Sequence, residues 1–178
     1  MRLQRRPVTV LFQDPVHCHA SVRENIAFGD SESISDLARV LQAAKDAGAL
    51  EPIERLPGDF EALLGKWFGG TELSGGKWQR IALTRDFFRQ ASLVILDEPT
   101  SSMDSWAEQD WPGRFRTLTA GRMALMITHR FTTSMHADII HVLDKGRIVE
   151  SGTHAELVSL GGAYASSWSV QMREIGHA

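Results

Sequence analysis

Three short apolar runs in the second half of the chain restrict its fold more than any other feature. They are Leu93–Leu96, Met123–Ile127 and Ile139–Leu143, and polar or turn-forming residues bound each of them. Runs of this length are typical of strands that are buried on both faces of a parallel sheet. Helices are expected at about residues 104–118, 154–160 and 162–172. This alternation predicts an α/β sheet, whose ligands bind at the carboxyl ends of the strands.

The first half of the chain adds one strand and then a long helical region. Val8–Phe12 is β-branched and aromatic, so it predicts a strand that ends at Gln13. Residues 21–90 have helical features, beginning with a capping box at Ser21 and Glu24, and a second helix is expected to end at Gly48. The last helix of the region begins near Ser74, with an expected inner face of Trp78, Ile81, Ala82 and Phe88. Further along, Arg147–Val149 is expected to form a hairpin with the third apolar run.

The charge and the cysteine content exclude several classes of protein. The 178 residues carry 19 Lys and Arg against 22 Asp and Glu, so the net charge of −3 offers no general attraction to nucleic acid. The single cysteine, Cys18, cannot form an internal disulfide framework. No apolar stretch approaches the roughly 20 residues that a membrane-spanning helix needs.

A serine, two glycines and a lysine mark the start of one helix. In Ser74-Gly75-Gly76-Lys77 the serine is the expected N-cap, and the glycines leave backbone N–H groups accessible. Such a helix end attracts anions through its unpaired donors and the helix dipole. The alternative is a capped helix that follows a glycine-rich turn and binds nothing.

Two adjacent carboxylates, Asp97 and Glu98, follow directly after the first apolar run. Neighbouring side chains at a strand end diverge, so one carboxylate can hold a magnesium ion while the other addresses a water molecule. The alternative, that both are ordinary solvated loop residues, does not explain why an anion-binding helix start lies shortly upstream.

Together these motifs resemble those of the ATP-binding cassette (ABC) ATPases over nearly the whole chain. Leu73–Arg80 is similar to the signature motif of the family, and Leu93–Glu98 to its Walker B strand. Ser101–Asp104 is similar to the D-loop, Ile127–Arg130 to the switch histidine segment, and Gln13 to the Q-loop glutamine. The five motifs stand in the order of the family at fitting intervals.

The resemblance implies a fold of the P-loop NTPase type, in which a mostly parallel sheet carries an inserted helical subdomain. Residues 1–178 would then form part of one ABC ATPase domain. About residues 16–90 would hold the Q-loop and the helical subdomain through the signature helix. About residues 91–178 would hold the Walker B strand, the D-loop, the switch histidine and the C-terminal helices.

The resemblance also implies catalytic roles in ATP hydrolysis with Mg²⁺. Glu98 would orient and deprotonate the attacking water, and Asp97 would help to hold Mg²⁺, mostly through water. Gln13 would touch the metal or the water and sense the transport domain. His129 would contact the γ-phosphate, where positioning and electrostatics supply most of the catalysis. Isolated histidines are more often structural, but the place of His129 after a strand favours the catalytic role.

A second nucleotide-binding domain would complete the site in a head-to-tail dimer. The residues that would bind nucleotide across the interface are Ser74, Gly75, Gly76, Lys77 and Asp104. Ser74 and Gly76 would reach the γ-phosphate, and Asp104 would help to couple the two sites. No nucleic-acid partner is implied.

Two segments resemble exporter-type members of the family, which are usually fused to a transmembrane half. They are Ser21–Gly29 and Gly146–His154. The resemblance therefore implies a transmembrane partner that docks through the Q-loop region, and a place at the cytoplasmic side of the cell membrane for the parent complex. A soluble ABC ATPase without transport is the alternative that these segments disfavour.

The 178 residues contain no Walker A sequence, Gly-x-x-x-x-Gly-Lys-Ser/Thr, whose backbone and lysine cradle phosphates. By resemblance, this loop and the β-rich start of the domain are expected upstream of Met1. A rival hypothesis is therefore a catalytically incompetent fragment, or a pseudogene product, that acts only as a dimerisation partner. Under both hypotheses the first strands are missing from these residues, so an apolar face or a bare edge of the sheet is expected to be exposed to solvent.

Several positions depart from the family pattern or suggest other chemistry. Lys77 stands where the signature commonly has Gln, and Asp86 occupies a place that is usually small and apolar. Pro112-Gly113 is expected to interrupt the helix after the D-loop. His17-Cys18-His19 suggests a metal site, but consecutive side chains diverge, and by resemblance this segment lies where a transport domain docks.

Overall fold

The computed structural model describes residues 8–66, 69–101 and 105–176, with 105–110 and 174–176 described by their backbone alone. The chain divides into two compact units, Met1–Ile127 and Thr128–Ala178. Each unit has its own cluster of buried apolar side chains. The division at about residue 90 that the resemblance implies stays a prediction.

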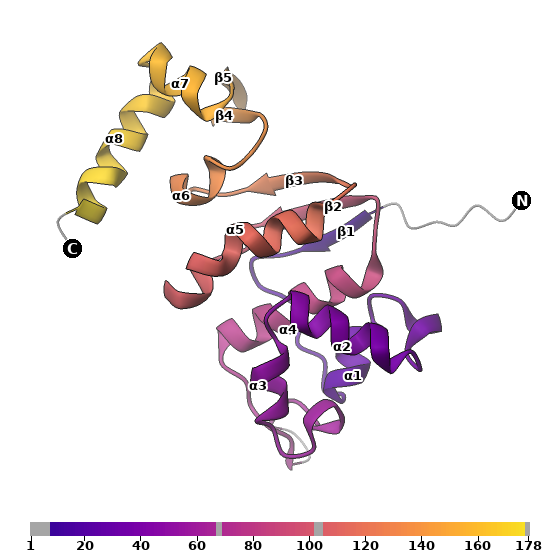
Figure 1. The fold of residues 1–178 in the computed structure, drawn as a ribbon. Coiled ribbons are helices and arrows are strands. Elements are labelled where there is room, and N and C mark those ends of the chain that lie inside the picture. Colours follow the sequence, from indigo (N-terminus) through magenta and orange to yellow (C-terminus); the bar gives the residue numbers. More distant parts are fainter. Residues whose placement is uncertain (1–7, 67–68, 102–104, 177–178) are drawn as a thin grey trace, which may run out of the picture. The chain divides into compact units, whose positions relative to one another are not determined.

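The first unit is built on a parallel sheet in the order β1-β2-β3 (Figure 1). Its strands are β1 (Val8–Leu11), β2 (Leu93–Asp97) and β3 (Met123–Ile127). Leu11 pairs with Leu96, and Asp97 pairs with Ile127, so the carboxyl ends of the three strands reach the same edge. The predicted strands and their parallel arrangement are confirmed.

Most helices of this unit lie between β1 and β2 in the sequence and gather around α4 (Figure 1). They are α1 (Val22–Ala27), η1 (Ser31–Ser33), α2 (Leu37–Asp46), α3 (Leu50–Glu54), η2 (Asp59–Glu61) and α4 (Gly75–Arg89), and α5 (Ser105–Thr119) follows β2. The predicted capping box is present: the Glu24 N–H donates to the Ser21 hydroxyl, and the Ser21 N–H donates to the Glu24 carboxylate. Gly48, at φ +68°, lies directly after the end of α2, as expected.

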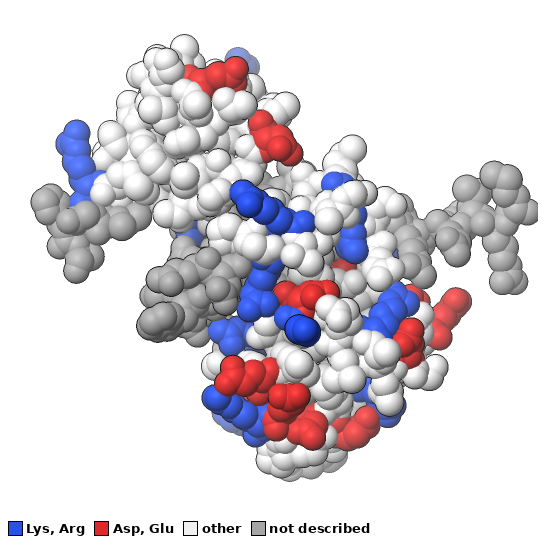
Figure 2. Space-filling model, viewed as in Figure 1, with Lys and Arg blue, Asp and Glu red and all other residues white. Residues whose placement is uncertain are grey.

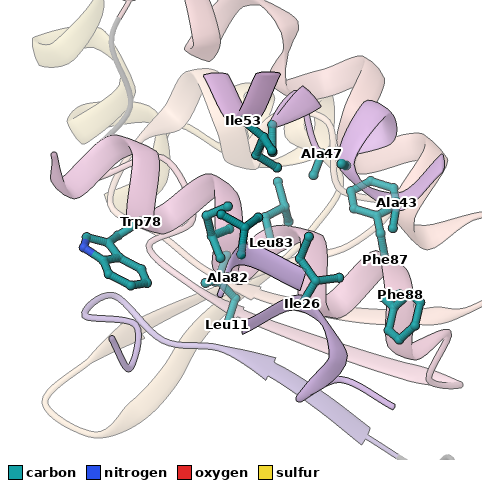
Figure 3. Close-up of a cluster of buried hydrophobic side chains, with 14 of the residues drawn as sticks. Leu11, Ile26, Ala43, Ala47, Ile53, Trp78, Ala82, Leu83, Phe87 and Phe88 are labelled. Carbon is teal, nitrogen blue, oxygen red and sulfur yellow. The ribbon is translucent and has the colours of Figure 1, made fainter. Parts of the chain in front are cut away.

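The core of the first unit forms around α4 (Figure 3). Every residue of its predicted inner face is buried: Trp78, Ile81, Ala82 and Phe88. Ile26 of α1 and Leu11 of β1 belong to the same cluster. Complete burial of a side chain such as Ile26 or Leu11 stabilises the fold by roughly 1.5–3 kcal/mol. Because buried residues lie almost all around α4, this helix is the centre of the unit.

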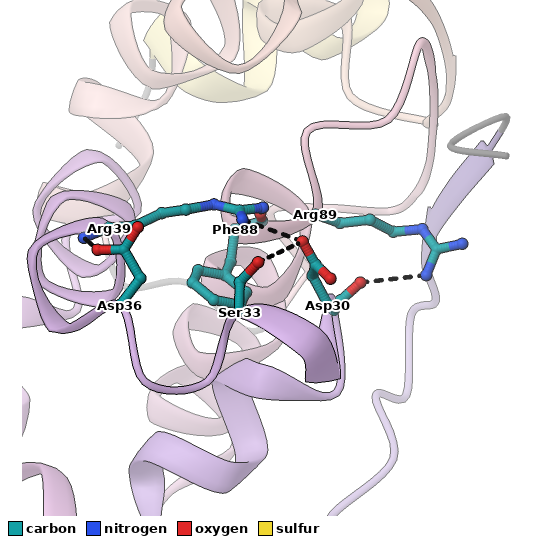
Figure 4. A network of polar contacts seen from close by, with 7 residues as sticks. Asp30, Ser33, Asp36, Arg39, Phe88 and Arg89 are labelled. Carbon is teal, nitrogen blue, oxygen red and sulfur yellow. Dashed lines mark hydrogen bonds and ion pairs between the residues drawn. The ribbon is translucent and has the colours of Figure 1, made fainter. Parts of the chain in front are cut away.

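Arg39 fastens α2 to the carboxyl-terminal turn of α4 (Figure 4). Its guanidinium donates to the Phe88 carbonyl, lies 4.4 Å from the centre of the Phe88 ring, and pairs with Asp30 at 3.0 Å. The Ser33 hydroxyl donates to the same Asp30 carboxylate at 3.0 Å. The Arg39 N–H donates to Asp36, which caps α2. A carbonyl near the end of α4 is thereby satisfied by a charged donor.

The burial of the apolar strands differs from the prediction. In β2, Val94 and Leu96 on one face are fully buried, whereas Leu93 and Ile95 on the other face are half-buried, so burial on both faces is met only in part. In β3, however, Met123, Leu125 and Ile127 are 71, 52 and 52% exposed. The prediction that β3 is buried on both faces is therefore wrong. These three residues alternate along β3 and share one face, which is exposed, whereas Met126 on the other face packs against the core.

Pro112 lies inside α5 without interrupting it, which corrects another prediction. The helix runs continuously from Ser105 to Thr119, although proline lacks an N–H and crowds the preceding turn. Trp111 and Leu118 are both buried in the core of the first unit. Their packing holds the helix together across the proline.

The second unit contains a hairpin and three helices. They are α6 (Phe131–Ser134), β4 (Ile140–Asp144), β5 (Arg147–Gly152), α7 (His154–Leu160) and α8 (Ala163–Gly176). The predicted antiparallel hairpin is confirmed. Burial of its apolar run on both faces is not, because Leu143 is 68% exposed, whereas Ile140 and Val142, which share one face, pack with Leu157 and Tyr164. A hairpin of two strands can bury only one of its faces.

The surface of the helical region is mixed in charge. On the face shown in Figure 2, acidic and basic side chains intermingle over α1–α4. The region has exposed ion pairs, Arg23 with Glu61 and Arg55 with Glu51. Pairs of this kind contribute about 0–1 kcal/mol each. None of the helices in the described residues combines the length and the apolar character that crossing a membrane requires.

One acidic side chain, Asp86 of α4, is buried in the first unit and only 3% exposed. The Thr9 hydroxyl donates to its Oδ1, whereas its Oδ2 has no hydrogen-bond partner among the described residues. Burial raises the pKa of this carboxyl from 3.8 to about 7. The Thr9 hydrogen bond and the positive charges of Arg85, Arg89 and Arg122 oppose that increase.

We predict that Asp86 makes the protein less stable as the pH rises from about 4 to 7. The folded state holds the proton of Asp86 more tightly than the unfolded chain does, so deprotonation favours unfolding across this window. Asp86→Asn should therefore gain stability over the wild type, by on the order of 4 kcal/mol at most above pH 7, and should gain little at pH 4. Urea unfolding between pH 4 and 8 measures this. Glu72→Gln, at an exposed site, is the control, and a gain independent of pH would contradict the prediction.

We also predict that the exposed side chains of β3 limit solubility. An apolar edge strand is a template for association between chains. Leu125→Lys should delay aggregation while changing the free energy of unfolding by less than about 1 kcal/mol. Val94→Lys, on the buried β2, should instead destabilise the protein by more than about 3 kcal/mol. Light scattering and thermal unfolding measure both effects, and unchanged aggregation of Leu125→Lys would refute the role of β3.

Candidate functional site

Three candidate residues lie where two neighbouring parallel strands end. Asp97 is the last residue of β2, and Glu98 follows it directly. Gln13 lies two residues after the end of β1, and it is exposed. Since Leu11 pairs with Leu96, these side chains share the carboxyl edge of the sheet. This is the edge at which ligands bind in parallel α/β sheets.

Hydrogen bonds fix the backbone of Glu98 in an uncommon conformation. Glu98 has φ +48°, in the left-handed region that few residues other than glycine adopt. Its N–H donates to the Ile127 carbonyl at 2.9 Å, and its own carbonyl accepts from the Ser101 N–H at 3.0 Å. A non-glycine residue in this region is typical of functional sites that the surrounding structure holds in place.

Gln79 ties α4 to the same point and was not anticipated from the sequence. This side chain is fully buried. Its Nε2 donates to the Glu98 carbonyl at 3.3 Å and approaches the Ser101 hydroxyl at 3.5 Å. The signal available in the sequence was a glutamine beside Trp78 on an otherwise apolar helix face. Gln79 thus connects the helix that begins after Ser74 to the end of β2.

The predicted anion-binding helix start is exposed at the beginning of α4. Ser74 is the N-cap residue, with φ −65° and ψ 159°, but its hydroxyl makes no capping hydrogen bond. Gly75 and Lys77 are exposed, and Gly76 is half-buried. The prediction that Ser74 is the N-cap residue is confirmed. Because its hydroxyl makes no capping hydrogen bond, the donors of the first turn are accessible to an anion.

The segment after Gln13 packs on α4. The rings of His17 and Trp78 are stacked, with centroids 4.3 Å apart and planes within 9°. Arg85 donates to the Val16 carbonyl at 3.0 Å. No group of three or more His, Cys, Asp or Glu side chains that could hold a metal occurs among the described residues. Mg²⁺ at Asp97 does not require such a group, because Mg²⁺ keeps several waters and needs few protein ligands.

His129 belongs to the second unit, where α8 supports its backbone. The Phe131 N–H donates to Gln171 Oε1 at 2.9 Å, and Gln171 Nε2 lies 3.5 Å from the His129 carbonyl. The Arg130 N–H donates to the Thr128 hydroxyl at 3.1 Å. Gln171 is a second residue that the sequence did not reveal, since its partners lie about 40 positions away. Asp104, the candidate D-loop residue, lies outside the described residues.

A cavity of about 260 Å³ lies beside β1 in the first unit. We call it the β1–α4 cavity. It is bordered by β1, the segment that follows it, the end of α1 and α4, and its lining includes Phe12, Val16, Phe28, Arg85 and Asp86. Phe12, Val16 and Phe28 are 57, 66 and 58% exposed, so its rim is apolar. The cavity is separate from the acidic end of β2.

Known proteins with similar sequences are ABC transporters. The chain is 41% identical over 172 residues to the ATP-dependent lipid A-core flippase of Hahella chejuensis, covering 96% of this chain and 28% of the flippase. It is 44% identical to the flippase of Alkalilimnicola ehrlichii (96% and 29%) and 37% identical to multidrug resistance protein homolog 65 of Drosophila melanogaster (94% and 13%). The chain thus spans less than a third of these relatives.

Two further comparisons concern the fold and the family model. The structure of a bacterial Atm1-family ABC exporter with ATP bound matches with a TM-score of 0.84 and 34% identity, covering 94% of this chain and 28% of that one. The expected P-loop NTPase-like fold is thereby confirmed. The family model described as ABC transporter matches residues 1–101, which is more than half of the chain. The chain therefore belongs to the ABC transporter family.

Proposed function

We propose that this chain acts as the nucleotide-binding part of an ABC exporter, in which ATP hydrolysis drives transport across a membrane. The observation that best supports this is the end of β2, where hydrogen bonds hold the backbone of Glu98 beside Asp97. The names of two relatives, a lipid A-core flippase and a multidrug resistance protein homolog, support a role in transport. The parent complex would lie at the cytoplasmic side of a membrane.

In this proposal, each residue at the strand ends has a separate task. Glu98 orients the attacking water and accepts its proton. Asp97 and Gln13 offer the oxygen ligands that Mg²⁺ prefers, directly or through water. The metal would neutralise charge on the phosphates. His129 would contact the γ-phosphate, and Gln171 would hold its loop in shape.

A second nucleotide-binding domain is the proposed partner at the start of α4. Ser74, Gly75, Gly76 and Lys77 would face the γ-phosphate held by that domain, since the exposed helix start favours an anion. Asp104 would help to couple the two sites. Gln79 supports this arrangement because it links the same helix to Glu98.

A transmembrane domain is the proposed partner at the β1–α4 cavity. The segment after Gln13 forms part of its rim, and three exposed apolar side chains surround it. A helix docked there would touch the same segment that carries Gln13. Transport and hydrolysis would thereby be linked through one short stretch of chain.

The second candidate function is a non-catalytic dimerisation partner. It would use the exposed start of α4 for dimerisation and would not hydrolyse ATP. The two candidates differ in whether Glu98 supports turnover when a Walker A loop is supplied.

We predict that the 178-residue chain alone has no ATPase activity that depends on Glu98. A chimera that joins the Walker A segment of the Hahella chejuensis flippase before Val8 should hydrolyse ATP. In the chimera, Glu98→Gln should lower kcat at least about 100-fold, as expected for loss of a general base. Phosphate release measures the rate. Turnover by the chain alone that Glu98→Gln abolishes would contradict the prediction. A folded but inactive chimera would favour the non-catalytic candidate.

We also predict that Ser74→Asp weakens ATP-dependent dimerisation without weakening the fold. Aspartate is a good N-cap residue, so the melting temperature should stay equal or rise. Its charge should repel the γ-phosphate and weaken ATP-dependent dimerisation of the chimera about tenfold or more. Ser74→Asn is the matched control, because asparagine is also a good N-cap residue and is nearly the size of aspartate, but it is uncharged. The chimera with Ser74→Asn should dimerise far better than the chimera with Ser74→Asp. Sedimentation velocity with ATP in the Glu98→Gln background measures dimerisation, and equal behaviour of the two variants would refute the role of Ser74.

A further inference from the structure

The ring of His17 covers the indole of Trp78 in the first turn of α4. The two rings are stacked, with centroids 4.3 Å apart and planes within 9° of each other. His17 is exposed, whereas Trp78 is only 3% exposed, so the imidazole shields one face of the indole from solvent. Stacked aromatic pairs contribute to stability beyond the area that they bury. The contact therefore joins the segment that follows Gln13 to the start of α4.

Hydrogen bonds hold the backbone on both sides of His17. Arg85 of α4 donates to the Val16 carbonyl at 3.0 Å, and the Asn25 side chain of α1 donates to the Cys18 carbonyl at 3.0 Å. Arg85 also donates to the side-chain oxygen of Asn25 at 2.7 Å, so the two supports are joined to each other. Because the carbonyls before and after His17 are both held, little backbone freedom is lost when its ring stacks, and the entropic cost of the contact is low.

Trp78 and Gln79 place the first turn of α4 between two parts of the candidate site. Through Trp78 the turn contacts the segment that carries Gln13, and through Gln79 it is bonded to the Glu98 carbonyl at 3.3 Å. The Ser74 hydroxyl makes no capping hydrogen bond, so this helix end lacks the usual local support. Contacts with neighbouring segments hold the turn in place instead.

We propose that His17 is a positioning residue, which holds the first turn of α4 in the arrangement that binds nucleotide across the dimer interface. This inference rests on the proposed role of Ser74 and its neighbours toward the γ-phosphate. A site that is ordered before its ligand arrives loses less conformational freedom on binding, and it therefore binds more tightly. His17 itself touches neither the metal nor the phosphates in this proposal, because it acts through Trp78.

The first experiment uses the 178-residue chain and needs no nucleotide. His17→Ala removes the ring from Trp78, and His17→Phe keeps a flat ring there. Hydrogen exchange of residues 78–81 should be at least about threefold faster in His17→Ala, as expected for loss of one aromatic contact, and close to the wild-type rate in His17→Phe. The last turn of α4 should exchange at the wild-type rate in both variants. His136→Ala, at an exposed site of the second unit, is the control.

The second experiment adds nucleotide. It uses the chimera with the flippase Walker A segment in the Glu98→Gln background, and sedimentation velocity measures its dimerisation as ATP is added. His17→Ala should weaken ATP-dependent dimerisation by about threefold or more, whereas His17→Phe should stay within about twofold of the chimera that carries His17. His136→Ala should leave dimerisation unchanged.

Different results would overturn the two proposals. Unchanged exchange in His17→Ala, or faster exchange along the whole of α4, would overturn the positioning role, because the effect must be local to the first turn. A His17→Phe variant that behaves like His17→Ala would exclude stacking as the cause. Unchanged dimerisation of His17→Ala, in a chimera that dimerises with ATP, would refute the role in nucleotide binding. A folded chimera that carries His17 and does not dimerise with ATP would instead contradict the proposed function, on which this role depends.

Discussion

The hydrogen bond from the buried amide of Gln79 to the Glu98 carbonyl holds the candidate site together. It joins α4 to the end of β2 across 19 positions of sequence, at 3.3 Å. Gln79 is fully buried, so an unmade bond would cost about 1–3 kcal/mol of desolvation. The helix that begins after Ser74 and the strand that ends at Asp97 are therefore held in one arrangement. The sheet register matters for the same reason, because it brings the Ile127 carbonyl to the Glu98 N–H.

Local patterns were enough to predict the strands, the main helices and the candidate residues at the strand ends. A capping box such as Ser21 with Glu24, or a run such as Leu93–Leu96, carries its information in adjacent residues. Burial was harder, because it depends on what packs against an element. β3 has the same apolar pattern as β2, but one of its faces is exposed. Pro112 should break a helix locally, yet the packing of Trp111 and Leu118 overrides it.

The residues that the sequence did not reveal are mostly glutamines with distant partners. A glutamine in a helix has no local signature, since its role depends on a backbone group elsewhere. Gln79 bonds to Glu98, and Gln171 of α8 accepts from the Phe131 N–H next to the switch segment. An amide offers both a donor and an acceptor without a charge. It can therefore shape a loop that carries a catalytic group without altering the local electric field.

Asp86 differs from these glutamines, because it is an ionisable group at a buried position of α4. Its Oδ2 has no hydrogen-bond partner among the described residues, and burial raises its pKa to about 7. The folded state holds the proton of Asp86 more tightly than the unfolded chain does, so a group that no local sequence pattern reveals makes the stability of the first unit depend on pH.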